Sequence, residues 1–215
     1  MKKDLTEMVF ILDRSGSMNG LEADTIGGFN GMLEKQKKEE GEAIITTVLF
    51  DDQYELIHDR FNINAVDKMT DKEYYVRGCT ALLDAMGSTI QKIINAQKHL
   101  PESEQAEHVI FVTITDGYEN ASCEYTYRDV KKMIEVQKEK GWEFMFLGAN
   151  IDAVAEAEKF GIEADRAVQY HSDSVGTALN YECVSNAMAC MRRDTMQLGS
   201  GWKEKIEKHL KKSRQ

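Results

Sequence analysis

The stretch VFILDRSGSMNG, residues 9–20, joins a continuous apolar run to a short loop rich in serine and glycine. Such a run is typical of a central parallel strand that is buried on both faces. The run ends at Asp13, and two hydroxyls follow at alternate positions, Ser15 and Ser17. Phosphate chemistry, a simple turn and a metal ion are each compatible with this pattern, so the rest of the chain has to decide among them.

Apolar runs alternate with helical patterns along the rest of the chain. Strands are expected at 7–13, 43–51, 54–61, 107–116, 142–149 and 167–170, and helices at about 20–40, 80–99, 126–140, 152–161 and 174–194. The turn DDQ is so short that the two strands beside it must be antiparallel, and the second is polar enough for an edge strand. The pattern predicts a doubly wound, Rossmann-like α/β sheet, mostly parallel, with one antiparallel edge strand and helices on both faces.

Two of the expected helices carry features that matter for packing. Gly27, Gly28 and Gly31 weaken the first helix, and we expect them to permit close packing. In the last long helix, an apolar stripe is expected to face the sheet. Its members are Val175, Ala178, Leu179, Cys183, Ala187, Cys190 and Met191.

The composition is that of a soluble globular protein with one main domain. The chain has 215 residues, 42% of them hydrophobic and 30% charged, and no apolar run is long enough to cross a membrane. The N-terminal segment lacks a signal-peptide pattern, so a cytoplasmic location is expected. We expect one domain over 1–195 and a basic C-terminal tail over 196–215, which forms a helix that docks on the domain.

Net charge and cysteine spacing exclude several classes of function. The net charge is −10, and because the tail is basic the body is still more acidic, which argues against nucleic-acid binding. The four cysteines form no CxxC pair, so zinc-ribbon and thioredoxin-like chemistry have no support. All four are expected to be free thiols, with Cys183 and Cys190 in the core.

Three segments fall at the carboxyl edge of the predicted sheet. They are DRSGS with Asp13, Ser15 and Ser17, GCTALLDAMG with Thr80, and TITDGYEN with Asp116. Taken singly, each fits helix capping or turn chemistry. Taken together, they place five oxygen-bearing side chains on one rim, with no His or Cys among them. That set suits a hard divalent cation, with Mg²⁺ expected and Mn²⁺ or Ca²⁺ as substitutes.

The ordered triple of Asp-x-Ser-x-Ser, Gly-x-Thr and Thr-Asp-Gly resembles the von Willebrand factor A (vWA) domain with its metal-ion-dependent adhesion site (MIDAS). The resemblance covers about residues 5–160, and GFNGMLEKQK, 28–37, is similar to the first helix of stand-alone intracellular bacterial or prophage members. It implies that Ser15, Ser17 and Thr80 are hydroxyl ligands, while Asp13 and Asp116 act mainly through bound water.

The same resemblance implies a protein-binding function without catalysis. One coordination position would be open to an Asp or Glu side chain of a partner protein. Met18 and Tyr118, the apolar residues expected nearest the ion, would seat the flank of that partner. Bacterial relatives often act beside AAA+ ATPases or in stress operons, so a partner of that kind is expected.

Two other functions remain open at this stage. A phosphatase or phosphotransferase of the haloacid dehalogenase type also places an Asp at the end of its first strand, but it needs a second Asp where this chain has Ser15. The other alternative is a structural vWA domain whose metal site is idle. Nucleotide binding and serine-hydrolase activity have no support, because the chain has no GxxxxGK[ST] motif and no GxSxG motif.

Overall fold

The computed structural model describes residues 1–193 and 198–214. Six strands form one sheet: β1 Lys2–Asp13, β2 Glu42–Phe50, β3 Tyr54–Asn62, β4 Ala106–Thr115, β5 Glu143–Ala149 and β6 Ala167–Tyr170. Their order is β3-β2-β1-β4-β5-β6, and every neighbouring pair is parallel except β2 and β3. The predicted fold class is therefore confirmed, including the antiparallel edge strand.

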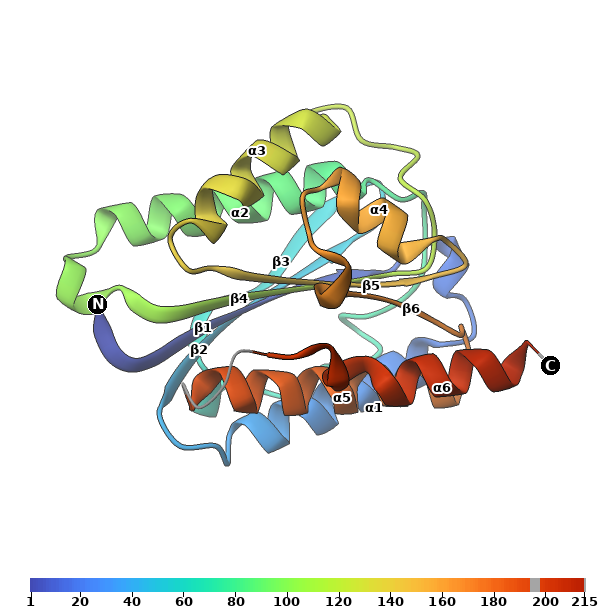
Figure 1. Cartoon of the computed structure of the whole chain (residues 1–215), viewed down its shortest axis with the longest axis horizontal. Helices are drawn as coiled ribbons and strands as arrows, with labels where there is room; N and C mark the ends of the chain where they lie inside the picture. Colours follow the sequence, from blue (N-terminus) through green and yellow to red (C-terminus); the bar gives the residue numbers. More distant parts are fainter. Residues whose placement is uncertain (194–197, 215) are drawn as a thin grey trace.

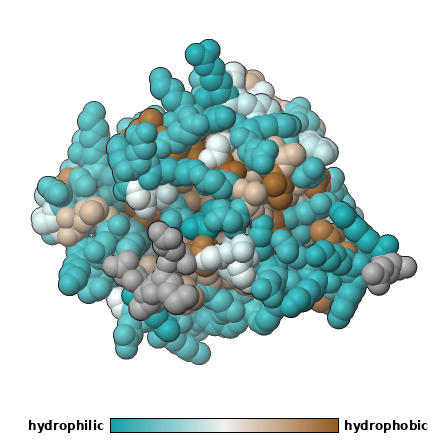
Figure 2. Space-filling view, in the orientation of Figure 1, coloured by the Kyte–Doolittle hydropathy of each residue, from teal (hydrophilic) through white to brown (hydrophobic). Residues whose placement is uncertain are grey.

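Two layers of helices cover the sheet (Figure 1). One layer contains α2 Leu82–His99, α3 Tyr127–Lys138 and α4 Ala153–Lys159, and the other contains α1 Glu22–Gln36, α5 Ser174–Arg192 and α6 Glu204–Ser213. Among the described residues, no helix is both long and apolar enough to cross a membrane. The face seen in Figure 2 is largely hydrophilic, with small hydrophobic areas between polar side chains.

The apolar run of β1 divides its side chains between two cores. Phe10 and Leu12 pack in the cluster that includes α1 and α5, whereas Val9 and Ile11 pack in the cluster beneath α2 and α3. This alternation follows from the two-residue period of a strand and explains why a strand covered on both faces reads as continuously apolar. The strand leads without interruption to Asp13 at the carboxyl edge.

The buried face of α5 is rotated from the predicted apolar stripe. Val175 and Cys190 are exposed, and the buried face instead includes the polar residues Thr177 and Asn180 beside Tyr181. The expectation that Cys190 lies in the core is therefore wrong. A prediction from hydrophobicity alone gave the wrong buried face for α5, because the side of the helix that packs against the protein carries polar side chains.

The C-terminal segment lies against the rest of the fold. Lys203 donates to the carbonyl of Ala167 at 2.7 Å, and the indole nitrogen of Trp202 donates to the carbonyl of Asp165 at 2.8 Å. Ile206 of α6 is buried in the core cluster that also contains α5. The domain boundary expected between 195 and 196 lies outside the described residues.

Candidate functional site

The site forms where β1 and β4 end side by side at the carboxyl edge of the sheet, away from the N-terminus in Figure 1. Asp13 is the last residue of β1, and Asp116 follows the last residue of β4, Thr115. The Thr115 hydroxyl donates to Asp13 Oδ2 at 2.6 Å, and the Asp116 amide donates to the same oxygen at 3.3 Å. Parallel pairing thus brings together two aspartates that are 103 residues apart in the sequence.

Hydrogen bonds to both carboxylate oxygens fix the orientation of Asp13. Its Oδ1 accepts the Ser15 amide at 2.7 Å, while Oδ2 accepts from the end of β4. The side chain is buried, and burial raises the pKa of Asp13, although the hydrogen bonds from Ser15 and Thr115 oppose that rise. A carboxylate held in this way fixes the loop that follows it, so Asp13 organises the site.

The three predicted hydroxyl ligands gather beside Gly117. The hydroxyls of Ser15 and Ser17 lie 3.1 Å apart. A Cβ built on Gly117 would lie 3.5 Å from the Ser17 hydroxyl and 3.8 Å from the Thr80 hydroxyl. A methyl group at this position would occupy the space beside the Ser17 and Thr80 hydroxyls.

Neither Ser15 nor Thr80 is used as a helix cap. Ser15 precedes a short 3₁₀ turn at Gly16–Met18, but its side chain makes no capping hydrogen bond. The N-cap of α2 is Ala81, one residue after Thr80, and it too has no capping side-chain bond. The capping explanation for these hydroxyls therefore does not hold, which leaves their oxygens available for a ligand.

The Thr80 loop is attached to both neighbouring loops. Thr80 donates its amide to Asn120 Oδ1 at 2.9 Å and accepts the Asn120 amide at 3.0 Å. On the other side, the amides of Gly16 and Arg77 donate to the carbonyls of Gly78 and Arg14. These backbone contacts hold the three segments predicted from the sequence against one another.

Asp116 is held by two residues that sequence reasoning missed. Its Oδ1 accepts from the side-chain amide of Asn150, and its Oδ2 accepts from the hydroxyl of Ser172. Asn150 follows β5 and Ser172 follows β6, so both stand at the same edge of the sheet. Their place after predicted strands was the available signal, but an Asn or a Ser there reads equally well as a turn residue.

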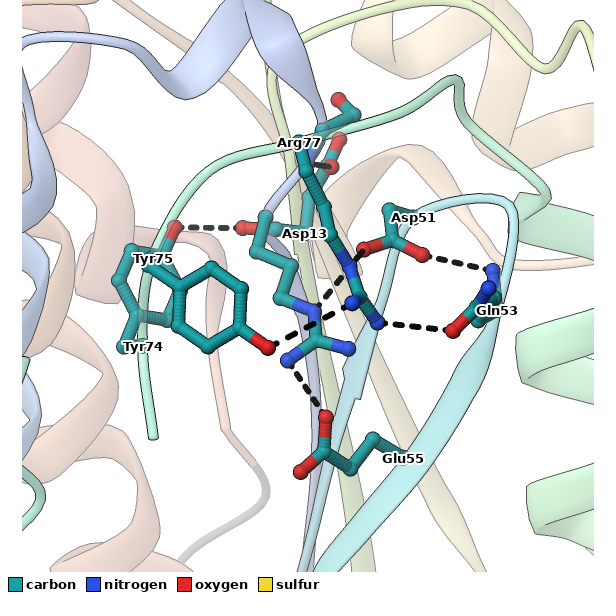
Figure 3. A network of polar contacts seen from close by, with 9 residues as sticks. Asp13, Asp51, Gln53, Glu55, Tyr74, Tyr75 and Arg77 are labelled. Carbon is teal, nitrogen blue, oxygen red and sulfur yellow. Dashed lines mark hydrogen bonds and ion pairs between the residues drawn. The ribbon is translucent and has the colours of Figure 1, made fainter. Parts of the chain in front are cut away.

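A partly buried ionic network borders the site on the side of β2 and β3 (Figure 3). Asp51 Oδ2 lies 3.1 Å from Arg14 Nε and 2.6 Å from Arg77 Nε, and Arg14 Nη1 lies 2.7 Å from Glu55 Oε2. Both guanidinium groups also lie over the Tyr75 ring, at 5.3 Å and 5.4 Å from its centroid. Arg14 and Arg77 carry the backbone groups that join the Ser15 and Thr80 loops, so the network braces the site.

The two residues predicted to contact a partner differ in the structure. Tyr118 is 53% exposed next to Gly117, so its ring is accessible at the surface. Met18 is only 2% exposed, because it packs in the hydrophobic core beneath the loop. Met18 therefore offers almost no surface to a partner, and that part of the prediction does not agree with the structure.

The donor set fits a hard divalent cation. The Ser17 and Thr80 hydroxyls both lie near Gly117, the Ser15 hydroxyl lies 3.1 Å from that of Ser17, and the carboxylates of Asp13 and Asp116 are buried at the same strand ends. In the described part of the chain, no three His, Cys, Asp or Glu side chains form a conventional metal cluster. A cation here would be Mg²⁺-like in its preference for oxygen, and Ser15, Ser17 and Thr80 would hold it.

Comparisons with known proteins identify the fold. No protein-family model and no curated protein matches the sequence. Among solved structures, proximal thread matrix protein 1 from the mussel byssus, with a zinc-occupied MIDAS motif, matches 88% of this chain at 15% identity with a TM-score of 0.56. A von Willebrand factor type A structure from Catenulispora acidiphila matches 87% at 15% identity with a TM-score of 0.58.

A third structure, the manganese-loaded TRAP protein of Plasmodium vivax, matches 69% of this chain at 17% identity with a TM-score of 0.50. The present chain spans 47%, 43% and 58%, respectively, of these three chains. At such low identity the likeness establishes the architecture alone.

Proposed function

We propose that this chain, which has the fold of the von Willebrand factor A domain, is a module that binds a protein partner through a divalent cation. Ser15, Ser17 and Thr80 hold the cation, and Asp13 and Asp116 act from behind these hydroxyls. The observation that carries the proposal is the convergence of the Ser17 and Thr80 hydroxyls on the open position beside Gly117. Structures of the same fold with zinc or manganese support it.

The charge of such a site determines the kind of partner. When bound, the cation supplies positive charge and a coordination position for an incoming oxygen. Both oxygens of Asp13 and of Asp116 already accept hydrogen bonds from the protein, and the converging hydroxyls carry no charge. None of the three proposed direct ligands therefore neutralises the cation, and an Asp or Glu side chain of a partner is the natural ligand for the remaining position. A component of an AAA+ ATPase or stress-response system is the partner we propose to test first.

A catalytic alternative finds less support in the geometry. A phosphotransferase of the haloacid dehalogenase type needs the first aspartate as an accessible nucleophile. Asp13 is only 1% exposed, and its oxygens accept bonds from the Ser15 amide and the Thr115 hydroxyl. We therefore propose binding without turnover, with Mg²⁺ as the working ion.

Titration calorimetry with Mn²⁺ tests the proposal. The wild-type protein should bind one ion, and Asp116→Ala should lose most of that binding while its circular dichroism remains unchanged. Asp59→Ala is the matched control, because Asp59 pairs with Lys92 on the surface, away from the site. Equal affinity in the wild type and Asp116→Ala would reject the assignment.

Partner capture tests the protein-binding part separately. Capture from a native lysate should require Mg²⁺ and fail in EDTA, and the partner can then be identified. Recovery of the same partner with and without divalent metal would mean that the site is idle in binding. Turnover of a generic phosphate ester that depends on Mg²⁺ would favour the enzyme instead.

A further inference from the structure

Asp116 is tied to two strand ends that lie outside the three predicted metal-site segments. The Asn150 amide and the Ser172 hydroxyl each donate to a different oxygen of its carboxylate. Asp116 is 1% exposed, so water does not compete freely for these contacts. Both donors are neutral, and they orient the carboxylate without cancelling its charge.

Both donors are themselves held in place. Asn150 has a φ of 54°, in the left-handed region that side chains other than those of Gly, Asn and Asp rarely adopt. Ser172 is followed by Asp173, whose carboxylate accepts the Gly176 amide at 2.6 Å at the start of α5. The same carboxylate lies 3.0 Å from His209 Nε2 of α6. The Ser172 hydroxyl is thus presented by a turn that Asp173 anchors to α5 and α6.

We propose that Asn150 and Ser172 are positioning residues that keep Asp116 from ligating the cation directly. The two donors fix the direction of both carboxylate oxygens, and the second lone pair that each oxygen keeps accepts a hydrogen bond from a metal-bound water. This inference rests on the proposed function and concerns the charge of that site. According to this inference, the residues that follow β5 and β6 set how much positive charge the cation presents to a partner, although these strands contribute none of the expected ligands.

Loss of either positioning residue should therefore have opposite effects on the binding of the cation and on the binding of an external carboxylate. A carboxylate that becomes a direct ligand adds a strong negative ligand and tightens cation binding. It also cancels positive charge and occupies a position, so an external carboxylate then binds more weakly. Loss of a merely structural contact weakens both kinds of binding, and an uninvolved residue changes neither.

The test compares Ser172→Ala with Ser172→Thr, which keeps a hydroxyl. Mn²⁺ affinity is measured by calorimetry, and bound water by the relaxation of water protons around Mn²⁺. Sodium acetate serves as the external carboxylate, and its binding is followed through the displacement of that water. Asn150→Gly is the second variant, because glycine keeps the left-handed backbone without strain.

In Ser172→Ala and Asn150→Gly, we expect Mn²⁺ to bind severalfold more tightly, with fewer bound waters and severalfold weaker acetate binding. Ser172→Thr should behave like the wild type. The inference would be overturned if Mn²⁺ affinity and acetate binding were unchanged in both Ser172→Ala and Asn150→Gly. It would also be overturned if these variants lost Mn²⁺ binding and acetate binding together. A wild-type protein that binds no Mn²⁺ would overturn the proposed function itself, and that result is distinguishable because it precedes any comparison of variants.

Discussion

Arg77 Nε donates to Oδ2 of Asp51 at 2.6 Å, and this contact joins the loop that carries Thr80 to the turn between β2 and β3. The same guanidinium donates to Gln53 Oε1 at 2.9 Å. Asp51 is fully buried, whereas the Arg77 side chain is 36% exposed. The contact therefore reaches from the interior to the surface and fixes the loop from one side.

Replacement of Arg77 by Met should affect cation binding more than stability. Arg77 is partly exposed, and the buried Asp51 keeps Arg14 as a partner at 3.1 Å when Arg77 is removed, so Arg77→Met should remain folded at a cost of about 1 kcal/mol. The loosened loop should place Thr80 less accurately and lower Mn²⁺ affinity severalfold. Lys92→Met is the control, because Lys92 lies 2.8 Å from Asp59 in another partly exposed pair. Equal Mn²⁺ affinity in the two variants would show that the network does not position Thr80.

Stability should depend on pH through Glu7, which is buried in β1. Its carboxylate accepts from Arg60 Nε at 2.7 Å and from the Gln97 amide. Burial raises the pKa of Glu7 above its ordinary value of 4.5, and these two donors oppose the rise. A raised pKa means that the folded state holds the proton more tightly, so this contribution to stability is present below pH 4.5 and is lost as pH rises through the folded-state value.

Arg60→Met should increase the loss of folding stability that occurs as the pH rises and Glu7 becomes charged. With Arg60 removed, a buried charge has lost its partner, and the free energy of unfolding should fall by about 3 kcal/mol at neutral pH. Protonation of Glu7 relieves this penalty, so the variant should recover stability between about pH 7.5 and about pH 5 to a greater extent than the wild type. Urea unfolding at the two pH values measures the difference. An identical deficit at both would mean that Glu7 does not titrate with the pair.

Adjacent arginines at the end of α5 should differ sharply in their contribution to stability. Arg192 is buried and donates to the carbonyls of Gln36, the last residue of α1, and of Glu40 and Gly41, which follow that helix. Arg192→Ala should cost about 2 to 4 kcal/mol, because it leaves the backbone and side-chain oxygens of the buried Gln36 without this donor. Thermal or urea unfolding provides the measurement.

Arg193→Ala is the control for Arg192. Arg193 pairs with Glu39 on the surface, and its side chain is 58% exposed, so its removal should change the free energy of unfolding by less than about 1 kcal/mol. Similar losses for both variants would show that the buried contacts of Arg192 do not join α1 to α5.

The sequence predicted those parts of the molecule that depend on local pattern. β1 could be found because a strand covered on both faces is apolar throughout, and the chain direction of parallel strands placed Asp13 and Asp116 on one edge. The antiparallel position of β3 followed from the short turn before it. These inferences need no knowledge of distant contacts.

The remaining features depend on contacts between distant segments. Arg14 has the sequence context of a loop residue, yet it is fully buried because Asp51 approaches it from the turn after β2 and Glu55 from β3. Asn150 and Ser172 have the composition of ordinary turns, and only the assembled sheet edge brings them to Asp116. Met18 is apolar and close in sequence to the site, but the 3₁₀ turn directs it into the core.

The cysteines should react as free thiols at different rates. All four are free, and Cys79, Cys123 and Cys190 are exposed, whereas Cys183 is buried. Burial also raises the pKa of the Cys183 thiol, so less of it is present as the reactive thiolate. Under non-reducing conditions, three groups should react quickly with a thiol reagent, and the fourth only after denaturation. Fewer than four groups in the denatured protein would indicate a disulfide.

The glycines of α1 should respond differently to alanine, although the sequence predicts close packing for all three. A Cβ on Gly28 would lie 2.3 Å from Cδ2 of the buried Tyr181 ring, whereas a Cβ on Gly27 or Gly31 would meet nothing within 4 Å. None of them has a positive φ. Gly28→Ala should therefore cost about 1 to 3 kcal/mol, because α1 and α5 would have to separate.

Gly27→Ala and Gly31→Ala should instead each stabilise the protein by up to about 1 kcal/mol, because alanine favours the helix and restricts the unfolded chain. The comparison is internally controlled, since all three substitutions add the same methyl group to the same helix. Urea unfolding of the three variants should give one loss and two gains. A loss at Gly27 or Gly31 as large as that at Gly28 would mean that this outer face of α1 is covered by another surface in solution, and the oligomeric state of the protein should then be measured.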